Sequence, residues 1–241
     1  MKNSQTLDKI LDKINVEVNY IRHGEAFLFD KIAKVKGFIT QDAYDSLTLT
    51  NKGKLQAKSV AKELLSRIDQ DEIIILISSP IKRVRQTVRI IKNEFIKHSI
   101  IIEEEIVVNF LRSAKGLERL KNEYGELTGN ELFERWIASS YPSSASYLET
   151  YLNVANRYKK FLSYINYLRA KYDHRIKKLR VVAIGHAELP DYIMVKYFNK
   201  YGLANCEVLN IVISSDNSVL LSITGKDNSL KVKETLENLL I

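Results

Sequence analysis

The chain has 241 residues, of which 45% are hydrophobic, and it contains only 9 glycines and 3 prolines. This composition excludes a disordered or fibrous protein and leaves room for one α/β domain or two small ones, with a sizeable buried core. The net charge is +8, from 37 Lys and Arg against 29 Asp and Glu, which favours acidic partners in general. Because the charges are dispersed along the chain, solvated lysines are the simpler interpretation.

The sequence carries no signal for a membrane or for secretion. Its apolar runs are short and interrupted by charged residues, so none is long enough to cross a bilayer. Residues 1–18 lack the long apolar core and small-residue cleavage site of a signal peptide. The single cysteine, Cys206, excludes an intramolecular disulfide and fits a reducing compartment, so we expect a cytoplasmic protein without membrane contact.

Six short runs rich in β-branched residues predict strands. They lie at residues 16–21, 72–78, 99–105, 179–185, 208–214 and 218–224. Their nearly continuous hydrophobicity and their alternation with helical patterns predict an α/β three-layer sandwich, in which a mostly parallel central sheet has helices on both faces. A short polar turn separates the last two runs, which therefore predict a hairpin.

Three longer segments predict helices. The first begins after Thr50, a plausible N-cap, and the second has Ser79 as its N-cap and Pro80 at its first position. The third spans residues 149–172. Apolar residues at helical spacing predict three buried faces: Val60, Ala61, Leu64 and Ile68; Val84, Val88, Ile91 and Phe95; and Val154, Tyr158, Phe161, Ile165 and Leu168.

The segment at about residues 107–146 has no regular pattern. We interpret it as an insert with one or two short helices, which would form a lid or side subdomain above the sheet. The whole chain, residues 1–241, would then be a single domain.

Two of the four histidines directly follow predicted strands: His23 in "VNYIRHG" and His186 in "VVAIGHA". The other two, His98 and His174, lie in polar, lysine-rich segments where exposure is expected. Ligands of open parallel sheets bind beyond the carboxyl ends of the strands. We therefore expect His23 and His186 to face the same crevice.

Two arginines are predicted to lie at the same end of the sheet. Arg22 precedes His23, and Arg83 is in the first turn of the helix that follows another strand. A guanidinium group suits phosphate because its planar donors pair with two oxygens at once. Gly24 would let the backbone approach a ligand closely. Together with His186, these residues predict a binding site for an oxyanion.

Several motifs resemble those of the histidine phosphatase superfamily, also called phosphoglycerate mutase-like. "RHGE" follows the first strand, "LTNKGKLQA" lies at a helix start, "SSPIKRVRQT" follows the second strand, and "VVAIGHAE" comes late in the chain. "ETYLNVANR" also resembles the family's Glu-Ser…Arg helix start. The matches follow the family's order from residue 16 to about 200, and they imply the phosphoglycerate mutase-like fold, in its RHGE branch.

The resemblance implies a metal-independent phosphomonoesterase that needs no cofactor. His23 would attack phosphorus and form a phosphohistidine, which water then hydrolyses. Arg22, Arg83 and His186 would bind the phosphoryl oxygens, and the neighbouring cations would keep His23 neutral by lowering its pKa. Further contacts with the substrate are expected near Gly24 and at Ala187, the residue after His186.

The sequence departs from the family at the general acid. The commoner branch supplies this glutamate from a Leu-x-Glu motif after the third strand, where this chain has Ser113. Glu188 in "GHAEL" resembles the His-Ala-Glu motif of phytase-like inositol polyphosphate phosphatases, in which the glutamate is the proton donor. Glu123 or Glu126 in "KNEYGELTG" resembles a mutase motif with the acid displaced, and Glu118 is a weaker alternative.

Other functions stay open. A phosphoglycerate mutase uses the same residues but returns the phosphoryl group to its substrate, and a non-catalytic phosphate- or phosphoprotein-binding module could share the fold. The expected ligand is a phosphorylated small molecule or a phosphoprotein, since no nucleic-acid recognition motif is present. The oligomeric state is open, with a homodimer as one option. Four tyrosines could line an entrance or a dimer contact, although plain packing is simpler: Tyr141, Tyr147, Tyr151 and Tyr158.

Overall fold

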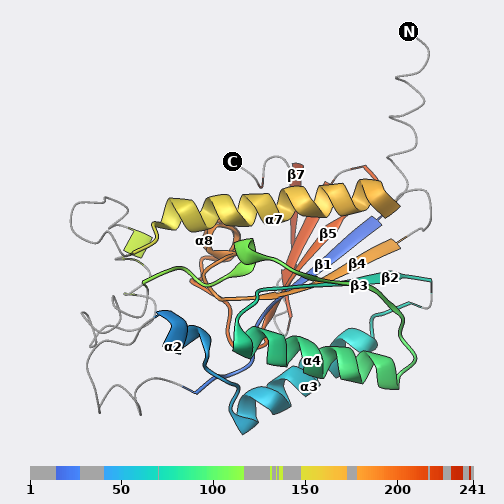
Figure 1. Cartoon of the computed structure of the whole chain (residues 1–241). Coiled ribbons are helices and arrows are strands. Elements are labelled where there is room, and N and C mark those ends of the chain that lie inside the picture. The colour runs from blue at the N-terminus through green and yellow to red at the C-terminus, as the bar shows by residue number, and fades with distance from the viewer. Residues whose placement is uncertain are drawn as a thin grey trace.

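In the computed structural model, a seven-stranded sheet lies between two layers of helices (Figure 1). The structure describes residues 15–27, 41–69, 71–116, 131, 134, 136–137, 148–172, 178–216, 218–224, 229–235 and 239.

The strand order across the sheet is β3-β2-β4-β1-β5-β6-β7. The strands are β1 (Asn15–Arg22), β2 (Ile73–Ser78), β3 (Ile102–Val107), β4 (Lys178–Gly185), β5 (Val208–Ile213), β6 (Ser218–Ile223) and β7 (Ser229–Thr235). The four strands from β3 to β1 pair in parallel, whereas β5, β6 and β7 extend the sheet with antiparallel pairs. The predicted α/β sandwich and the predicted hairpin, β5–β6, are confirmed, and β7 is a strand that the sequence pattern did not indicate.

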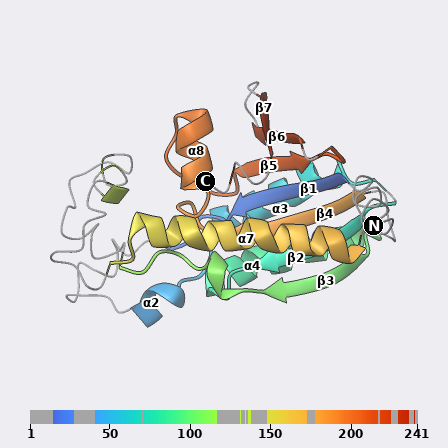
Figure 2. The same ribbon diagram turned by 90° about the horizontal axis from the view of Figure 1, so that it is seen from above.

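The helices cover both faces of the sheet, as Figures 1 and 2 show. They are α2 (Gln41–Asp45), α3 (Asn51–Leu65), α4 (Lys82–Lys97), α7 (Tyr151–Tyr172) and α8 (Asp191–Phe198), with a short 3-10 turn, η2 (Asn109–Leu111). Helices α3 and α4 lie on one face, and α7 crosses the other. No helix among the described residues combines the length and hydrophobicity needed to cross a membrane.

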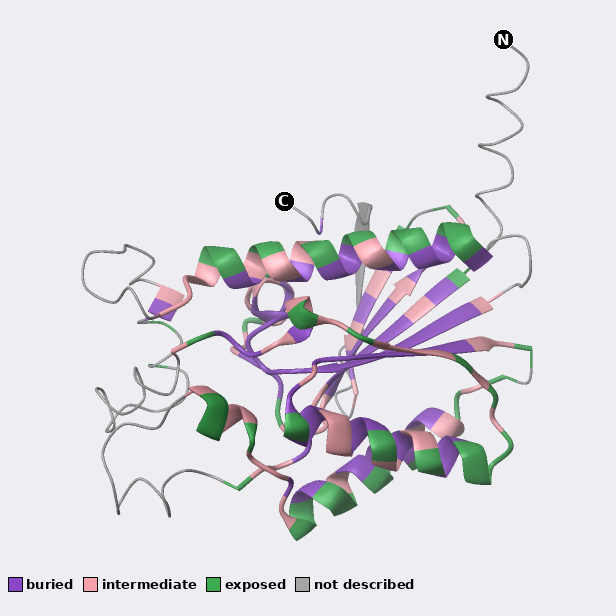
Figure 3. Ribbon diagram, in the orientation of Figure 1, coloured by how far each residue is buried: buried purple, intermediate pink, exposed green. Residues whose placement is uncertain are grey.

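Each helix turns its predicted apolar face to the sheet, which Figure 3 shows as buried colour on the inner sides of α3, α4 and α7. All the residues predicted for these faces are buried except Ile68, which follows the end of α3 and is partly buried. Tyr158 is part of this core. The ring of Tyr151 packs against that of Trp136, with 5.5 Å between the ring centroids. The packing interpretation therefore holds for these two tyrosines, while Tyr141 and Tyr147 lie outside the described residues.

The start of α3 is as predicted, but the start of α4 is not. The Thr50 hydroxyl accepts a hydrogen bond from the Gly53 N–H, as an N-cap does. Helix α4 begins only at Lys82, with Ile81 as its N-cap. The first helical hydrogen bond runs from the Arg85 N–H to the Ile81 carbonyl at 3.0 Å, whereas the Ser79 hydroxyl accepts from the Ile81 N–H at 3.3 Å, ahead of the helix.

Strand β3 also begins later than the predicted run at residues 99–105. Ser99 adopts a left-handed conformation with φ 60°, and the Ile100 N–H donates back to the Phe95 carbonyl. Ser99 and Ile100 therefore belong to the C-terminal end of α4, and the strand begins after them.

The predicted insert at residues 107–146 lies mostly outside the described residues, so it stays a prediction, as does the single-domain assignment. The part nearest the sheet is described. Here η2 follows β3, and the chain continues to Gly116. Trp136 is buried in the core beneath α7, and its indole N–H donates to the Glu149 carbonyl at 2.9 Å.

Candidate active site

The two histidines predicted to share a crevice do lie together. His23 follows β1 and His186 follows β4, and these strands are parallel neighbours. The His23 N–H donates to the Gly185 carbonyl at 3.1 Å, which joins the two strand ends. The imidazole rings are 5.1 Å apart between centroids and nearly perpendicular, at 70°. Both side chains are almost fully buried.

Arg83 joins both imidazoles from α4. Its Nε donates to His23 Nε2 at 3.1 Å, and its second terminal nitrogen lies 3.4 Å from His186 Nδ1. A third nitrogen donates to the Tyr44 carbonyl in α2 at 2.9 Å, and the guanidinium carbon lies 4.2 Å from the centre of the Tyr44 ring. Arg83 is only 1% exposed. We call Arg83, His23 and His186 the Arg83 cluster.

The hydrogen bonds fix the tautomer of His23. Its Nδ1 lies 2.7 Å from the Gly24 carbonyl, which can only accept, so Nδ1 carries the proton. Its Nε2 then holds a lone pair, which in this structure accepts from Arg83. A neutral imidazole with a free lone pair at Nε2 is the form that can act as a nucleophile.

Burial and charge keep both imidazoles neutral. Loss of solvation lowers the pKa of His23 well below its usual value, and the positive charges of Arg83 and Arg22 lower that pKa further. The pKa of His186 is also well below its usual value, through burial first and Arg83 second. The predicted lowering of the His23 pKa is therefore present, although burial contributes more than either arginine.

Arg22 lies near the Arg83 cluster but is held by a different group. Its terminal nitrogen donates to the Leu203 carbonyl at 2.7 Å, and its buried Nε has no hydrogen-bond partner among the described residues. No hydrogen bond among those residues joins it to the three members of the cluster. The prediction that Arg22 grips the same anion as Arg83 therefore rests on its proximity and charge.

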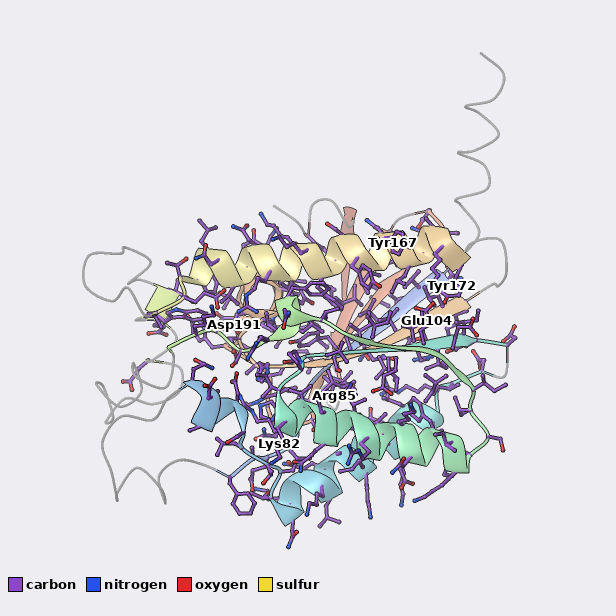
Figure 4. All side chains as sticks on the ribbon, in the orientation of Figure 1. Lys82, Arg85, Glu104, Tyr167, Tyr172 and Asp191 are labelled. Atoms are coloured by element: carbon purple, nitrogen blue, oxygen red, sulfur yellow. The ribbon has the colours of Figure 1, made fainter. Side chains whose placement is uncertain are left out.

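A loop at residues 199–206 positions Arg22. The Gly202 N–H in this loop donates to Asp191 at 2.6 Å, and the Asn205 amide donates to the His23 carbonyl at 3.1 Å. Asp191 begins α8 and lies between α7 and the sheet (Figure 4), where burial raises its pKa well above the usual range. In the sequence Asp191 has no distinguishing pattern, because an acidic residue in a first helical turn has an ordinary explanation.

Tyr20 fixes the backbone of His186. Its hydroxyl donates to the His186 carbonyl at 2.9 Å and accepts from the His186 N–H at 3.0 Å. The neighbouring residue must be glycine, because a Cβ on Gly185 would lie 2.2 Å from the Tyr20 hydroxyl oxygen. The sequence pattern gave only a buried strand position for Tyr20, since this contact joins residues 166 apart.

Gly24 and Ala187 have packing explanations in the structure. A Cβ on Gly24 would lie 2.4 Å from the Gly53 carbonyl oxygen, so the glycine allows the loop after β1 to approach α3. The Gly24 N–H donates to the Thr87 hydroxyl at 3.2 Å. Ala187 packs against Gly202. A substrate contact near either residue stays a prediction.

A match to a family model shows which family the chain belongs to. A model of the histidine phosphatase superfamily (branch 1) matches residues 19–233. The chain belongs to this superfamily. A search of curated proteins finds no significant match.

Solved structures confirm the predicted phosphoglycerate mutase-like fold. A phosphoglycerate mutase from Bacillus anthracis has a TM-score of 0.59 at 15% identity, with 95% of this chain and 97% of that chain covered. A putative alpha-ribazole-5'-P phosphatase from Escherichia coli has a TM-score of 0.55 at 15% identity, over 92% and 98%. A mycobacterial glucosyl-3-phosphoglycerate phosphatase has a TM-score of 0.54 at 16% identity, over 87% and 97%.

Glu149 and Arg157, in the segment that resembles a Glu-Ser…Arg helix start, form a bidentate ion pair. The two Arg157–Glu149 contacts measure 2.7 and 2.9 Å. Arg157 also donates to the carbonyls of Phe110 and Arg112. The pair therefore fixes the chain after β3 against the start of α7.

Glu188 reaches the segment after β3. Its carboxylate oxygen Oε1 accepts from the Ala114 N–H at 2.8 Å, and the residue is 6% exposed. Ser113, at the position expected for glutamate, is buried next to this contact. The other candidates for the acid, Glu118, Glu123 and Glu126, lie outside the described residues. Among the described residues, no cluster of His, Cys, Asp and Glu could hold a metal ion.

We expect Tyr20→Phe to destabilise the protein by about 1–3 kcal/mol, because it leaves the buried N–H and carbonyl of His186 without partners. Tyr158→Phe is the matched control. Its buried hydroxyl, next to Tyr20, has no hydrogen-bond partner among the described residues, so its loss should change stability by less than about 0.5 kcal/mol. Urea unfolding measures both, and equal effects would contradict this role of Tyr20.

The two buried histidines should make stability depend on pH. Each folded-state pKa is lowered, so below about pH 6.5 the unfolded chain takes up protons that the folded protein does not. The free energy of unfolding should therefore fall as the pH decreases from 6.5, by up to about 1.4 kcal/mol per pH unit for each histidine, until the folded-state pKa is reached. Urea unfolding between pH 7.5 and 5 gives the free energy of unfolding at each pH. This free energy should depend less steeply on pH in His23→Asn and in His186→Asn than in the wild type. An unchanged pH dependence would contradict the neutral state of the two histidines.

Proposed function

We propose that the protein is a metal-independent phosphomonoesterase that forms a phosphohistidine at Nε2 of His23. One observation carries this proposal. The buried guanidinium of Arg83 lies against both imidazoles, while the hydrogen bond from His23 Nδ1 to Gly24 leaves the Nε2 lone pair for attack. A fixed cation beside a neutral nucleophile is the arrangement that phosphoryl transfer needs.

In the first step, Nε2 attacks phosphorus and the bond from phosphorus to the ester oxygen breaks. The phosphate would take over the Arg83 N–H groups that now face the histidines. His186 can also donate a hydrogen bond to the phosphate. Its Nδ1 faces Arg83, which can only donate, so the imidazole proton lies on Nε2. This Nε2 is 3.4 Å from the Ser79 hydroxyl. Arg22 adds positive charge nearby. In the second step, water attacks the phosphohistidine, which releases phosphate and restores His23.

We assign the general acid to Glu188. The departing oxygen needs a proton in the first step, and the attacking water must lose one in the second, so one carboxyl group can serve both. The hydrogen bond from the Ala114 N–H holds the Glu188 carboxylate beside Ser113, where the commoner branch places its glutamate. The side chain would thus supply the same chemical group from a different strand end.

Mutase activity is the second candidate, favoured by the similar fold of the Bacillus anthracis phosphoglycerate mutase. It differs in the fate of the phosphohistidine, which returns the phosphoryl group to the substrate instead of to water. Phosphate release, measured beside interconversion of phosphoglycerate isomers, separates the two activities.

The nucleophile can be tested by trapping. Rapid acid-free quenching of the protein with a labelled phosphomonoester should give one phosphorylated histidine, at residue 23, by mass spectrometry. His23→Ala should abolish the label and lower phosphate release by at least about 1,000-fold. His98→Ala, which changes an exposed histidine at the end of α4, should retain both. Phosphate release that survives in His23→Ala would contradict the proposal, and binding without release would indicate a phosphate-binding module.

The acid can be tested by varying the leaving group. We expect Glu188→Gln to slow hydrolysis of an alkyl phosphate by about 100- to 10,000-fold, because an alkoxide leaves only with a proton. Hydrolysis of p-nitrophenyl phosphate should fall much less in its first step, since p-nitrophenolate leaves unprotonated. Single-turnover kinetics measure this step, with Glu63→Gln on the exposed side of α3 as control. An equal loss with both substrates would remove Glu188 as the acid.

A further inference from the structure

The excess positive charge of the protein is concentrated on two neighbouring helices. Helices α3 and α4 contain ten Lys and Arg residues and only two acidic residues, whereas the rest of the chain contains 27 residues of each kind. The net charge of +8 therefore comes entirely from these two helices. They lie on the face of the sheet opposite α7 (Figure 1), and their apolar sides share one core.

Half of these ten cations form no ion pair with any described residue. Four of the others pair with carboxylates, and Arg83 belongs to the Arg83 cluster. The remaining five are all exposed, and they are Lys54, Lys58, Lys62, Lys82 and Arg89. Folding therefore leaves these charges available for an external anion.

The two acidic residues of the helices are already paired. Glu63 pairs with Arg67, and the Glu94 carboxylate accepts from Lys97 at 2.8 Å. The charge of Lys58 also contributes to the lowered pKa of Glu94, after the hydrogen bond from Lys97. Because Lys58 is in α3 and Glu94 is in α4, the charges of the two helices belong to one surface.

The exposed side of each helix combines cations with one large apolar side chain, and Figure 3 shows exposed colour along both outer sides. On α4, three exposed residues recur every seven positions and so lie along one line: Lys82, Arg89 and Ile96. On α3, a line at helical spacing contains Leu55, Lys58 and Lys62. Leu55 is 66% exposed and Ile96 is 57% exposed. We call the five unpaired cations, together with Leu55 and Ile96, the basic face.

This combination fits the surface of an anionic membrane. The negative potential of such a surface attracts Lys and Arg, and leucine or isoleucine side chains between the cations can enter the interface below the headgroups. A nucleic-acid backbone would also attract the cations, but protein–nucleic acid interfaces are polar and offer no comparable apolar layer for Leu55 and Ile96. The expectation of no membrane contact rested on the lack of a spanning or signal segment, and a peripheral contact needs neither.

We propose that the basic face binds peripherally to membranes that contain anionic lipids. Its cations contact the headgroups, and Leu55 and Ile96 enter the interface between them. This surface is separate from the Arg83 cluster, so the inference does not depend on the proposed phosphatase function.

Vesicle binding tests this inference. The full-length protein is sedimented with phosphatidylcholine vesicles that contain either about 30% phosphatidylserine or none. At about 0.1 M salt we expect at least about tenfold tighter binding to the anionic vesicles, and at about 1 M salt this binding should be lost because the charges are screened. Equal binding to both kinds of vesicle, or no binding to either, would contradict the proposal.

Two variants with the same change in net charge locate the contact. A cation near an anionic surface changes the affinity about fivefold, so the double variant Lys58→Gln, Lys62→Gln should bind anionic vesicles about 10- to 30-fold more weakly. The control Lys159→Gln, Lys160→Gln removes two charges from α7, on the opposite face of the sheet, and should weaken binding by less than about twofold. Equal losses would show that net charge alone is responsible and would overturn the basic face. Urea unfolding should give the wild-type midpoint for both variants, since all four side chains lie at the surface.

The apolar residues separate a membrane from nucleic acid. Leu55→Gln and Ile96→Gln should each weaken binding to the anionic vesicles by at least about threefold, because a polar side chain gains nothing from entering the interface. If both variants bind the vesicles as the wild type does, the proposal is wrong. Tighter binding to a DNA duplex of about 20 base pairs than to the vesicles would also overturn it, and would assign the basic face to nucleic acid.

Discussion

The site depends on one buried guanidinium group. Arg83 donates to His23, lies against His186 and is itself held by the carbonyl of Tyr44. A buried cation is costly unless its donors are satisfied and its charge is compensated. Neutral imidazoles and a carbonyl satisfy the donors of Arg83 without cancelling its charge. The net positive charge that results is what an anionic phosphoryl group would meet.

The positions of the imidazoles depend on backbone contacts between strands. The His23 N–H donates to the Gly185 carbonyl, and the Tyr20 hydroxyl forms hydrogen bonds with both the N–H and the carbonyl of His186. These bonds connect β1 with the end of β4. Because the parallel strands are buried on both faces, each histidine is set by the sheet and not by a mobile loop. A side chain held this way loses little entropy when a ligand binds beside it.

Glu188 illustrates how the ends of two different strands come together. Strand ends that are distant in sequence converge at one edge of a parallel sheet, so a carboxylate after β4 can reach the segment after β3. Glu188 does so by accepting a hydrogen bond from the Ala114 N–H.

By itself, the sequence determined the fold class, the apolar faces of the helices and the strand ends that carry Arg22, His23 and His186. These features follow from local periodicity and from the order of strands and helices, which the chain encodes over short distances. Only the tertiary structure decided that Tyr20 fixes His186, that Arg22 donates to the Leu203 carbonyl, and that Asn205 donates to the His23 carbonyl. Each of these depends on a contact between residues far apart in the chain, where one hydrogen bond or one missing Cβ selects the geometry and local patterns carry no record of it.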